Sequence, residues 1–362
     1  MAAALPDIQV TGSGPVALAF ALFALRQGID RRRLRLERRD EPPPAALAAR
    51  QLALSLGSWQ LLQRIARPPA AAPIATVDVS VTGHPGRTRI TAAQMRVPAL
   101  GYVVRYAPLL EALRDAARSA GLLDAPDPAA GEAPPAGLCI HAEGDAGEDA
   151  SVLDFDQAAL LAEVEAENAH GTTAWECFTP EGPLALLPLP EPRRYSLVWC
   201  ATPAQSRRRA ALDPAALAAE LQDAFGWPLG RLAIASPCFV APMVRRTRRE
   251  VVRGGEAWIG NAAQALHPVA GQGLNLGLRD AFELARSLAE AAAEGLPADA
   301  ALQRFARARR ADRLGTIGLT DALARIFTVA PLRPLQSVAL AALDIAPPAR
   351  SALARRLMFG HR

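Results

Sequence analysis

Apolar and polar positions at the start of the chain predict a strand, a helix and a second strand. Residues 7–10 (DIQV) read as a short apolar strand, residues 17–27 as a helix, and residues 34–36 as a second strand. Residues 12–17 read GSGPVA, and Glu37 follows the second strand. This order of strand, GxGxxA, helix, strand and acid is typical of a dinucleotide-binding βαβ unit.

The residue types in this unit suit the binding of a pyrophosphate. Gly12 permits a tight turn, Gly14 lets the backbone approach a phosphate, and Ala17 still permits close packing of helix on strand. The free N–H groups and the dipole of a helix N-terminus favour an anion, and Glu37 can accept hydrogen bonds from ribose hydroxyls. The alternative is an ordinary turn between strand and helix, with Glu37 as a surface residue.

The middle of the chain predicts further helices and strands. Residues 42–49 read as a Pro/Ala linker and residues 121–137 as a surface loop of low complexity. Helices are expected at 50–65, 109–120 and 210–225. Strands are expected on both sides of a turn within 77–90, at 102–104, as a pair within 184–200, and across 232–253.

A second strand–loop–helix unit follows later in the chain. Residues 257–259 read as a strand, residues 262–272 as a loop, and a long helix runs from near Gly273 to Gly295. Because glycines surround its start, this helix N-terminus is again suited to negative charge.

Length and composition restrict the class of protein. A chain of 362 residues with 51% hydrophobic and 21% charged residues fits about two globular domains. No apolar run reaches the ~18 residues of a membrane span and no signal peptide is apparent, which predicts a cytoplasmic protein. The four dispersed cysteines argue against a disulfide scaffold and a zinc site, so no metal is expected.

Charge is distributed unevenly along the chain. Lysine is absent, and residues 119–192 contain 15 of the 36 acidic residues but none of the 40 arginines. No nucleic-acid motif accompanies the basic remainder, so nucleic-acid binding is not expected. The arginine run at 245–249 reads as a solvated strand edge, with a surface facing anionic lipid as the alternative.

Residues 260–281 (GNAAQALHPVAGQGLNLGLRDA) resemble the second flavin-binding motif of FAD-dependent aromatic monooxygenases. Asn261 and Gln264 make this stretch similar to one branch of the ubiquinone-biosynthesis hydroxylases, the 2-polyprenyl-6-methoxyphenol hydroxylases, whose sibling enzymes carry Asp and His there. Further similar stretches lie at 50–55, 178–189, 196–199 and 312–321, so the resemblance covers nearly the whole chain except about 115–150.

The resemblance implies an α/β fold in which a Rossmann-like FAD-binding domain of the glutathione-reductase type is interleaved with an antiparallel β-sheet substrate domain, followed by C-terminal helices. The FAD-binding domain would comprise residues 1–75, 101–153 and 254–298, the substrate domain residues 76–100 and 154–253, and the helical region residues 299–362.

The resemblance also implies site residues. Those expected to bind FAD are Gly12, Gly14, Ala17, Glu37, Arg50, Arg105, Gly260, Asn261, Gly271, Gln272, Gly273, Leu274 and Asn275. Backbone groups of 271–273 would stabilise the anionic reduced flavin. Pro268 would close off the flavin edge where oxygen reacts. His267 is expected to stabilise the loop, with a proton shuttle for the phenol as the alternative. Trp175 and Phe178 are expected in the core rather than in a substrate pocket.

FAD carries the chemistry in this family. The resemblance implies that NAD(P)H reduces FAD and that a flavin C4a-hydroperoxide hydroxylates a polyprenylated phenol on the route to ubiquinone. A substrate in the bilayer implies peripheral contact with the inner face of the membrane or with other ubiquinone-biosynthesis proteins. Residues 328–360 suit an interfacial or partner-binding amphipathic helix, or a helix pair packed on its own domain.

One family motif is altered in this chain. The family has Asp-Gly followed by Ser and Arg at the end of a strand near the flavin, whereas residues 140–145 read IHAEGD and the next Ser is Ser151. The interval 105–144 is also short, so strands expected there would be missing. Two hypotheses follow: an active hydroxylase that holds FAD through its first and last motifs, or a degenerate flavoprotein-like subunit that acts as a non-catalytic scaffold in a quinone-biosynthesis complex.

Overall fold

The computed structural model describes residues 5–37, 43–123, 137–143, 146–147, 149–266, 271–328 and 333–360. The helices in this part of the chain are α1 (Pro15–Arg26), α2 (Ala45–Ala48), α3 (Leu56–Gln63), α4 (Ala92–Met95), α5 (Tyr106–Ser119), α6 (Pro203–Ala210), α7 (Pro214–Phe225), α8 (Gln272–Ala293), α9 (Ala298–Thr328), α10 (Arg333–Ile345) and α11 (Pro347–Phe359), with short 3₁₀ turns at Arg31–Arg33 and Gly260–Ala262.

In the described ranges, seventeen strands form three sheets. The strands are β1 (Ile8–Thr11), β2 (Leu34–Leu36), β3 (Gln51–Ser55), β4 (Ala72–Ile74), β5 (Thr76–Val81), β6 (Arg87–Thr91), β7 (Gly101–Arg105), β8 (Leu138–His141), β9 (Ala150–Ala166), β10 (Thr173–Phe178), β11 (Pro183–Pro188), β12 (Arg194–Ala201), β13 (Leu232–Ile234), β14 (Phe239–Arg248), β15 (Val252–Arg253), β16 (Glu256–Trp258) and β17 (Gln264–Ala265).

A five-stranded sheet of order β15-β16-β8-β1-β2 forms the α/β part of the molecule. β2, β1, β8 and β16 run parallel, and β15 pairs antiparallel at one edge. The α1 helix is apolar and buried from Pro15 to Ala24 because it lies between this sheet and α8. This is the mixed α/β architecture that the resemblance implies.

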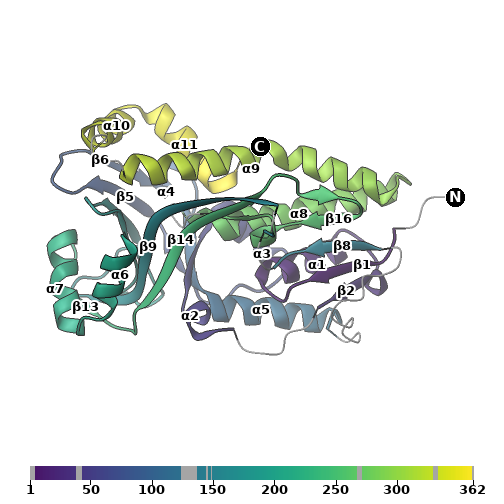
Figure 1. Cartoon of the computed structure of the whole chain (residues 1–362), viewed down its shortest axis with the longest axis horizontal. Helices are drawn as coiled ribbons and strands as arrows, with labels where there is room; N and C mark the ends of the chain where they lie inside the picture. The colour runs from purple at the N-terminus through teal and green to yellow at the C-terminus, as the bar shows by residue number, and fades with distance from the viewer. Residues whose placement is uncertain are drawn as a thin grey trace.

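The largest sheet has nine strands, eight of them in the order β17-β14-β9-β12-β11-β10-β5-β6. All its pairs run antiparallel except β10 with β5. The long strands β9 and β14 pair along their length and extend from the α/β part to the body of this sheet (Figure 1). The two sheets therefore draw on interleaved segments of the chain.

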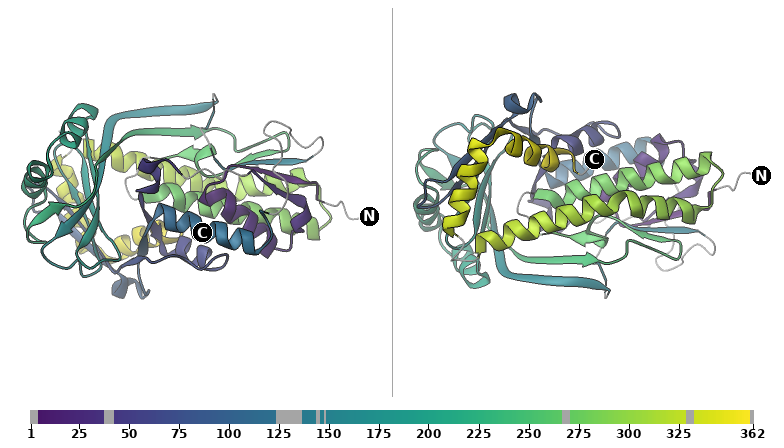
Figure 2. Two further views of the ribbon diagram at one scale, coloured as in Figure 1. Left: turned by 90° about the horizontal axis from the view of Figure 1, so that it is seen from below. Right: turned by 90° about the horizontal axis from the view of Figure 1, so that it is seen from above.

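Long helices run along one side of both sheets. In Figures 1 and 2, α9 packs beside α8 and continues toward the large sheet, where α10 contacts β6 and β5. The α11 helix then turns back and packs on α3. Within the described residues, no helix is long and apolar enough to cross a bilayer.

Many expected elements are confirmed, among them the strands within 77–90, 102–104 and 184–200 and the helix after Gly271. The helix expected over 50–65 is wrong in its first part. Residues 51–55 form β3, because they pair with β7 from Gln51 opposite Arg105 to Ser55 opposite Gly101. The helix begins only at Leu56, where the Ser55 side chain accepts a hydrogen bond from the Ser58 N–H.

Three other expectations need correction. The helix expected over 210–225 begins only at Pro214, because Ala210 ends α6 and Asp213 caps a new helix that has Pro214 at its first position. The linker expected at 42–49 contains the short helix α2. Most of the loop expected at 121–137 lies outside the described residues. In the interval thought to lack strands, β8 is present and pairs with β1.

Candidate functional site

The turn between β1 and α1 presents backbone N–H groups to carboxylates. Gly12 has φ +106°, which a residue with a side chain rarely adopts. The Gly12 N–H donates to Glu37 Oε2 at 2.7 Å, and the Ser13 N–H donates to Glu143 Oε2 at 2.6 Å. Gly14 caps α1 without a side-chain hydrogen bond. The loop therefore offers donors to negatively charged oxygens, as phosphate binding requires.

A second helix N-terminus lies at the start of α8. Its capping residue Gly271 has φ +58°, and no side chain caps the helix. A Cβ atom added to Gly273 would meet no atom of the described residues within 4 Å, so the backbone there is not covered by any of them. This helix end can approach a planar or anionic group closely.

The two helix starts are held together through Val16 of α1. A Cβ atom added to Gly260 would lie 3.1 Å from the Val16 side chain, and one added to Gly277 would lie 2.8 Å from it. Larger residues at either glycine would separate α1 from α8. The family-like stretch 260–281 thus positions one helix start against the other.

Asn275 fastens the start of α8 to β3. Its Oδ1 accepts from the Ser55 N–H at 2.8 Å, and its Nδ2 donates to the carbonyl oxygens of Ala53 at 2.9 Å and Gly271 at 2.6 Å. All three hydrogen bonds are made to the protein's own backbone. Asn275 therefore positions β3, the strand that directly follows Arg50.

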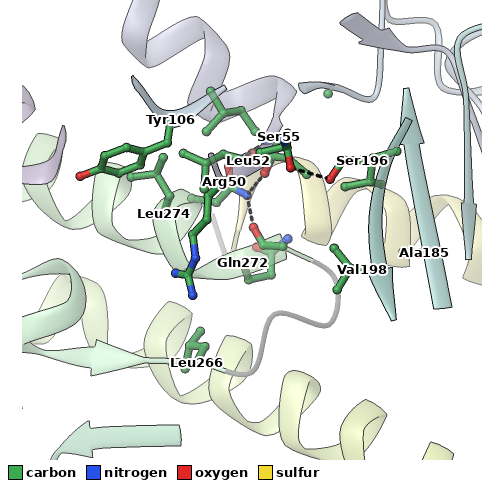
Figure 3. Close-up of a pocket in the computed structure, with 18 of the residues that line it drawn as sticks. Arg50, Leu52, Ser55, Tyr106, Ala185, Ser196, Val198, Leu266, Gln272 and Leu274 are labelled. Carbon is green, nitrogen blue, oxygen red and sulfur yellow. Dashed lines mark hydrogen bonds between the residues drawn. The ribbon is translucent and has the colours of Figure 1, made fainter. Parts of the chain in front are cut away.

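A pocket of about 630 Å³ lies between these helix starts and the large sheet. Arg50, Tyr106, Gln272 and Leu274 lie on one side, and Ser196, Val198 and Ala185 of the sheet lie opposite (Figure 3). The Ser196 hydroxyl donates to Gln51 Oε1 at 3.0 Å, which ties the sheet to β3. Residues of α11 complete the walls: Ala354, Leu357 and Met358.

Most of the residues expected at the site come together at this pocket. Those that line it are Gly14, Arg50, Gly260, Asn261, Gly271, Gln272, Gly273, Leu274 and Asn275. Gly12 and Glu37 lie at the adjoining glycine turn, and Ala17 is fully buried in α1. His267 and Pro268 lie outside the described residues.

Arg105 lies elsewhere, contrary to expectation. It does not line the pocket, because its guanidinium binds Glu163 at 3.1 Å and Glu191 at 3.0 Å. Hydrogen bonding by Glu191 and Glu163 raises the pKa of Arg105 against the opposing effect of burial. Arg105 therefore joins β7 to the large sheet.

The pocket also contains residues that sequence reasoning missed. Glu143 stands where the family has the Asp of its Asp-Gly pair, and its carboxylate reaches the Ser13 N–H. Burial, with a smaller effect of Glu143, raises the pKa of the Tyr106 phenol, which also lines the pocket. A Glu-Gly dipeptide at 143–144 was the available signal for Glu143. Tyr106 follows Arg105 directly and had no motif of its own.

Several side chains for which the sequence left two interpretations make contacts within the protein. Trp175 packs edge-on against Phe225 in the core of the large sheet, although it also reaches the pocket wall, and Phe178 packs with Val81. The arginine run is not a simple solvated edge. Arg245 binds Asp321 in a half-buried ion pair, and the Arg248 guanidinium lies 4.0 Å from the centre of the Trp258 ring.

The residues at the pocket fit FAD. A glycine turn whose N–H groups donate to carboxylate oxygens, together with an acid after β2, suits the adenosine diphosphate half, and a second uncapped helix start suits an electron-rich ring. The family's Asp-Gly motif is altered in this chain, which put the FAD contacts on that side in doubt. Glu143 lies there, so a carboxylate is still present.

Comparisons with known proteins agree with this geometry. Residues 139–313 match the family model described as FAD binding domain. The chain is 36% identical over 217 residues to ubiquinone hydroxylase UbiL of Rhodospirillum rubrum, a match that covers 57% of this chain and 49% of the relative. It is 29% identical over 380 residues to the 3-demethoxyubiquinol 3-hydroxylase of Escherichia coli, with 93% and 94% covered.

Solved structures show the same fold. The p-nitrophenol 4-monooxygenase PnpA of Pseudomonas putida superposes with a TM-score of 0.74 at 16% identity and covers 99% of each chain. The match to the Rhodospirillum rubrum relative spans about half of that protein's length, whereas the match to the Escherichia coli relative is nearly complete.

Proposed function

We propose that this chain is an FAD-dependent aromatic-ring monooxygenase of ubiquinone biosynthesis, and that its pocket hydroxylates a ring carbon of a polyprenylated phenol. The observation that supports this most is the juxtaposition of two uncapped helix starts with an apolar sheet face across one pocket. The two helix starts suit a dinucleotide cofactor, and the apolar sheet face suits an apolar substrate.

FAD, when bound, supplies the activated oxygen that is transferred to the ring. The chain's own residues bind and orient. The glycine turn and the start of α1, which no side chain caps, would face the pyrophosphate, Glu37 would accept from the ribose, and Arg50 offers a positive charge beside the pocket. The N-terminus of α8 stabilises negative charge on the ring system.

The remaining walls exclude water from the reacting ring. Valine, leucine and alanine side chains of the large sheet face the pocket, and Leu357 and Met358 of α11 close it. An apolar enclosure favours binding of a prenylated ring and protects an oxidising site from side reactions with water. We propose NADPH or NADH as the reductant.

The proposal includes contact of α10 with a membrane. Val338 on α10 is 64% exposed and Ile345 at its end is 83% exposed, which is unusual for large apolar side chains. The α10 helix precedes α11, whose residues line the pocket. An interfacial position of α10 would bring the pocket close to a bilayer that holds the substrate.

The scaffold hypothesis receives no support. The two curated relatives named above are called hydroxylases and the solved neighbour a monooxygenase. The altered Asp-Gly motif had suggested that FAD contacts were lost, but the carboxylate of Glu143 is present at that place.

One experiment tests the proposal directly. The purified protein is titrated with FAD, and the stoichiometry is read from flavin absorbance. The loaded protein then receives oxygen, NADPH or NADH, and ortho-geranylphenol, and mass spectrometry measures product with one added oxygen. We expect about one FAD per chain and hydroxylated product. A protein that never retains FAD, or that retains it and adds no oxygen to any prenylated phenol, would overturn the proposal.

A further inference from the structure

One face of the large sheet forms the wall of the pocket opposite the helix starts. Successive residues of a strand point to opposite faces, and the pocket-lining residues of β9, β11 and β12 follow this alternation, as Leu161, Ala185 and Val198 show. Those three strands contribute alanine, leucine, valine, proline, serine and cysteine to the pocket. None of these side chains carries a charge at neutral pH.

Glu176 of β10 is the exception on this face. It lies opposite Ala185 of β11 and Val79 of β5, and it lines the pocket. Among the described residues, no group donates a hydrogen bond to its carboxyl oxygens and no cation pairs with it. Burial alone raises the pKa of this carboxyl to about 7. A carboxyl left without a protein partner in an apolar wall is available to a ligand.

Within the described part of the chain, the other ionisable groups around the pocket do not neutralise Glu176. Cys200 lines the pocket from β12, two strands away from β10, and burial together with the Glu176 charge raises the pKa of that thiol to about 12. Arg50, Tyr106 and Glu143 line the pocket from the α/β part. The lining residues on β14, α8 and α11 are not ionisable.

We propose that the Glu176 carboxylate is a catalytic residue that receives the hydroxyl group of the phenol substrate and accepts its proton as the ring is attacked. This assignment rests on the proposed function, because it takes the substrate to be a phenol. The chemical class follows from the wall itself: a ring with an apolar substituent and one hydrogen-bond donor satisfies both the apolar side chains and the single carboxylate.

Proton transfer at Glu176 is balanced. The substrate O–H bond breaks, an O–H bond forms on a carboxyl oxygen of Glu176, and the electron pair stays on the phenol oxygen, where it activates the ring positions ortho and para to it. The pocket holds one negative charge before and after the transfer, so no second charge is desolvated. A base that titrates near neutral pH suits this task.

Turnover gives the first test. The FAD-loaded wild type, Glu176→Gln and Glu165→Gln are compared with ortho-geranylphenol across pH 5.5 to 8.5. Glu165 is a 52% exposed glutamate on β9 of the same sheet, paired with Arg194 rather than facing the pocket, and serves as the matched control. We expect Glu176→Gln to retain FAD, to lose about a hundredfold or more in kcat, and to lose the rise in rate near pH 7. An FAD-loaded Glu176→Gln protein within about twofold of wild type at every pH would overturn the assignment.

Binding gives a second test that needs no turnover. The oxidised, FAD-loaded protein is titrated with ortho-geranylphenol and with its methyl ether, which lacks the donor. We expect wild type to prefer the phenol by about tenfold and Glu176→Leu to prefer it by less than about threefold. A preference that Glu176→Leu keeps, or that wild type lacks, would overturn the assignment. If wild type shows the preference and adds no oxygen, the hydroxylase proposal fails while the phenol site at Glu176 stands.

Discussion

Gln264 Nε2 donates a hydrogen bond of 2.6 Å to Asp280 Oδ2, and both side chains are almost completely buried. The bond joins β17 to α8. Ala265 and Leu266, which follow Gln264, line the pocket. Arg313 of α9 donates to Gln264 Oε1 at 2.6 Å, and Arg309 of α9 binds Asp280 at 2.7 Å, so one edge of the pocket depends on a buried polar network between two helices.

The buried polar network is therefore expected to stabilise the fold. Arg309 binds both Asp280 and Asp312, and its replacement by Met leaves two buried carboxylates with fewer partners. We expect Arg309→Met to lower the free energy of unfolding by about 3–5 kcal/mol, measured by urea denaturation. The matched control is Arg310→Met, because Arg310 is exposed on the same helix. Equal stability of both variants would show that the network contributes little.

The glycine turn is expected to control FAD affinity. A Cβ atom at position 12 would lie 2.4 Å from the Glu143 Cβ, at a φ of +106°. We expect Gly12→Ala to weaken FAD binding by about tenfold or more, because a misplacement of the turn displaces its N–H donors. Fluorescence titration with FAD measures the change.

Gly83→Ala is the control for this comparison. Gly83 also has positive φ, at +75°, but an added Cβ atom there meets no atom within 4 Å. Both variants carry backbone strain, and only Gly12→Ala adds the collision with Glu143. Matching losses of FAD affinity would mean that strain, rather than the turn, weakens binding.

Glu176 is expected to make stability depend on pH without any ligand. Its pKa in the fold, about 7, lies above the ordinary value of 4.5, so protonation stabilises the fold. That contribution is complete below about pH 4.5 and is lost as pH rises through about 7. The melting temperature of Glu176→Gln, which cannot ionise, should therefore rise relative to wild type between pH 5 and pH 8. A difference that stays constant over this pH range would contradict the unusual environment of Glu176.

The exposed apolar residues of α10 are expected to contribute to membrane contact. Val338→Ser with Ile345→Ser removes two large exposed apolar side chains. We expect the double variant to float with vesicles of phosphatidylethanolamine and phosphatidylglycerol several-fold less than wild type. Its FAD content should be unchanged, because neither residue lines the pocket. The reciprocal control is Leu314→Ser, because Leu314 is 60% exposed on α9. Flotation that is equal in all three proteins would remove α10 as a contact.

The parts of the site that could be predicted are those encoded within short segments. Gly12, Gly14, Gly271 and Gly273 mark helix starts by local sequence, and the structure brings both helix starts to one pocket. The first part of the supposed helix at 50–65 failed because β3 forms through pairing with β7, about fifty residues later. Local periodicity carries no record of a distant pairing partner.

The expectation for Arg105 was wrong, and Glu176 was not found from the sequence, for a related reason. The two carboxylates that hold Arg105 away from the pocket, Glu163 and Glu191, lie on separate later segments. Glu176 reads as one acid among many in an acidic stretch, and its importance appears only when four strands align one face against the helix starts. Side chains whose role depends on the register of a sheet cannot be assigned from neighbours in sequence.

The pocket draws its walls from positions between Gly14 and Met358. No short contiguous fragment contains the pocket, because the segments that form its two sides alternate along the chain. Deletion mapping would therefore misreport this protein: removing α11 to probe membrane binding would also remove Leu357 and Met358 from the pocket wall. Point substitutions, rather than truncations, are the means to separate where this protein docks from what it oxidises.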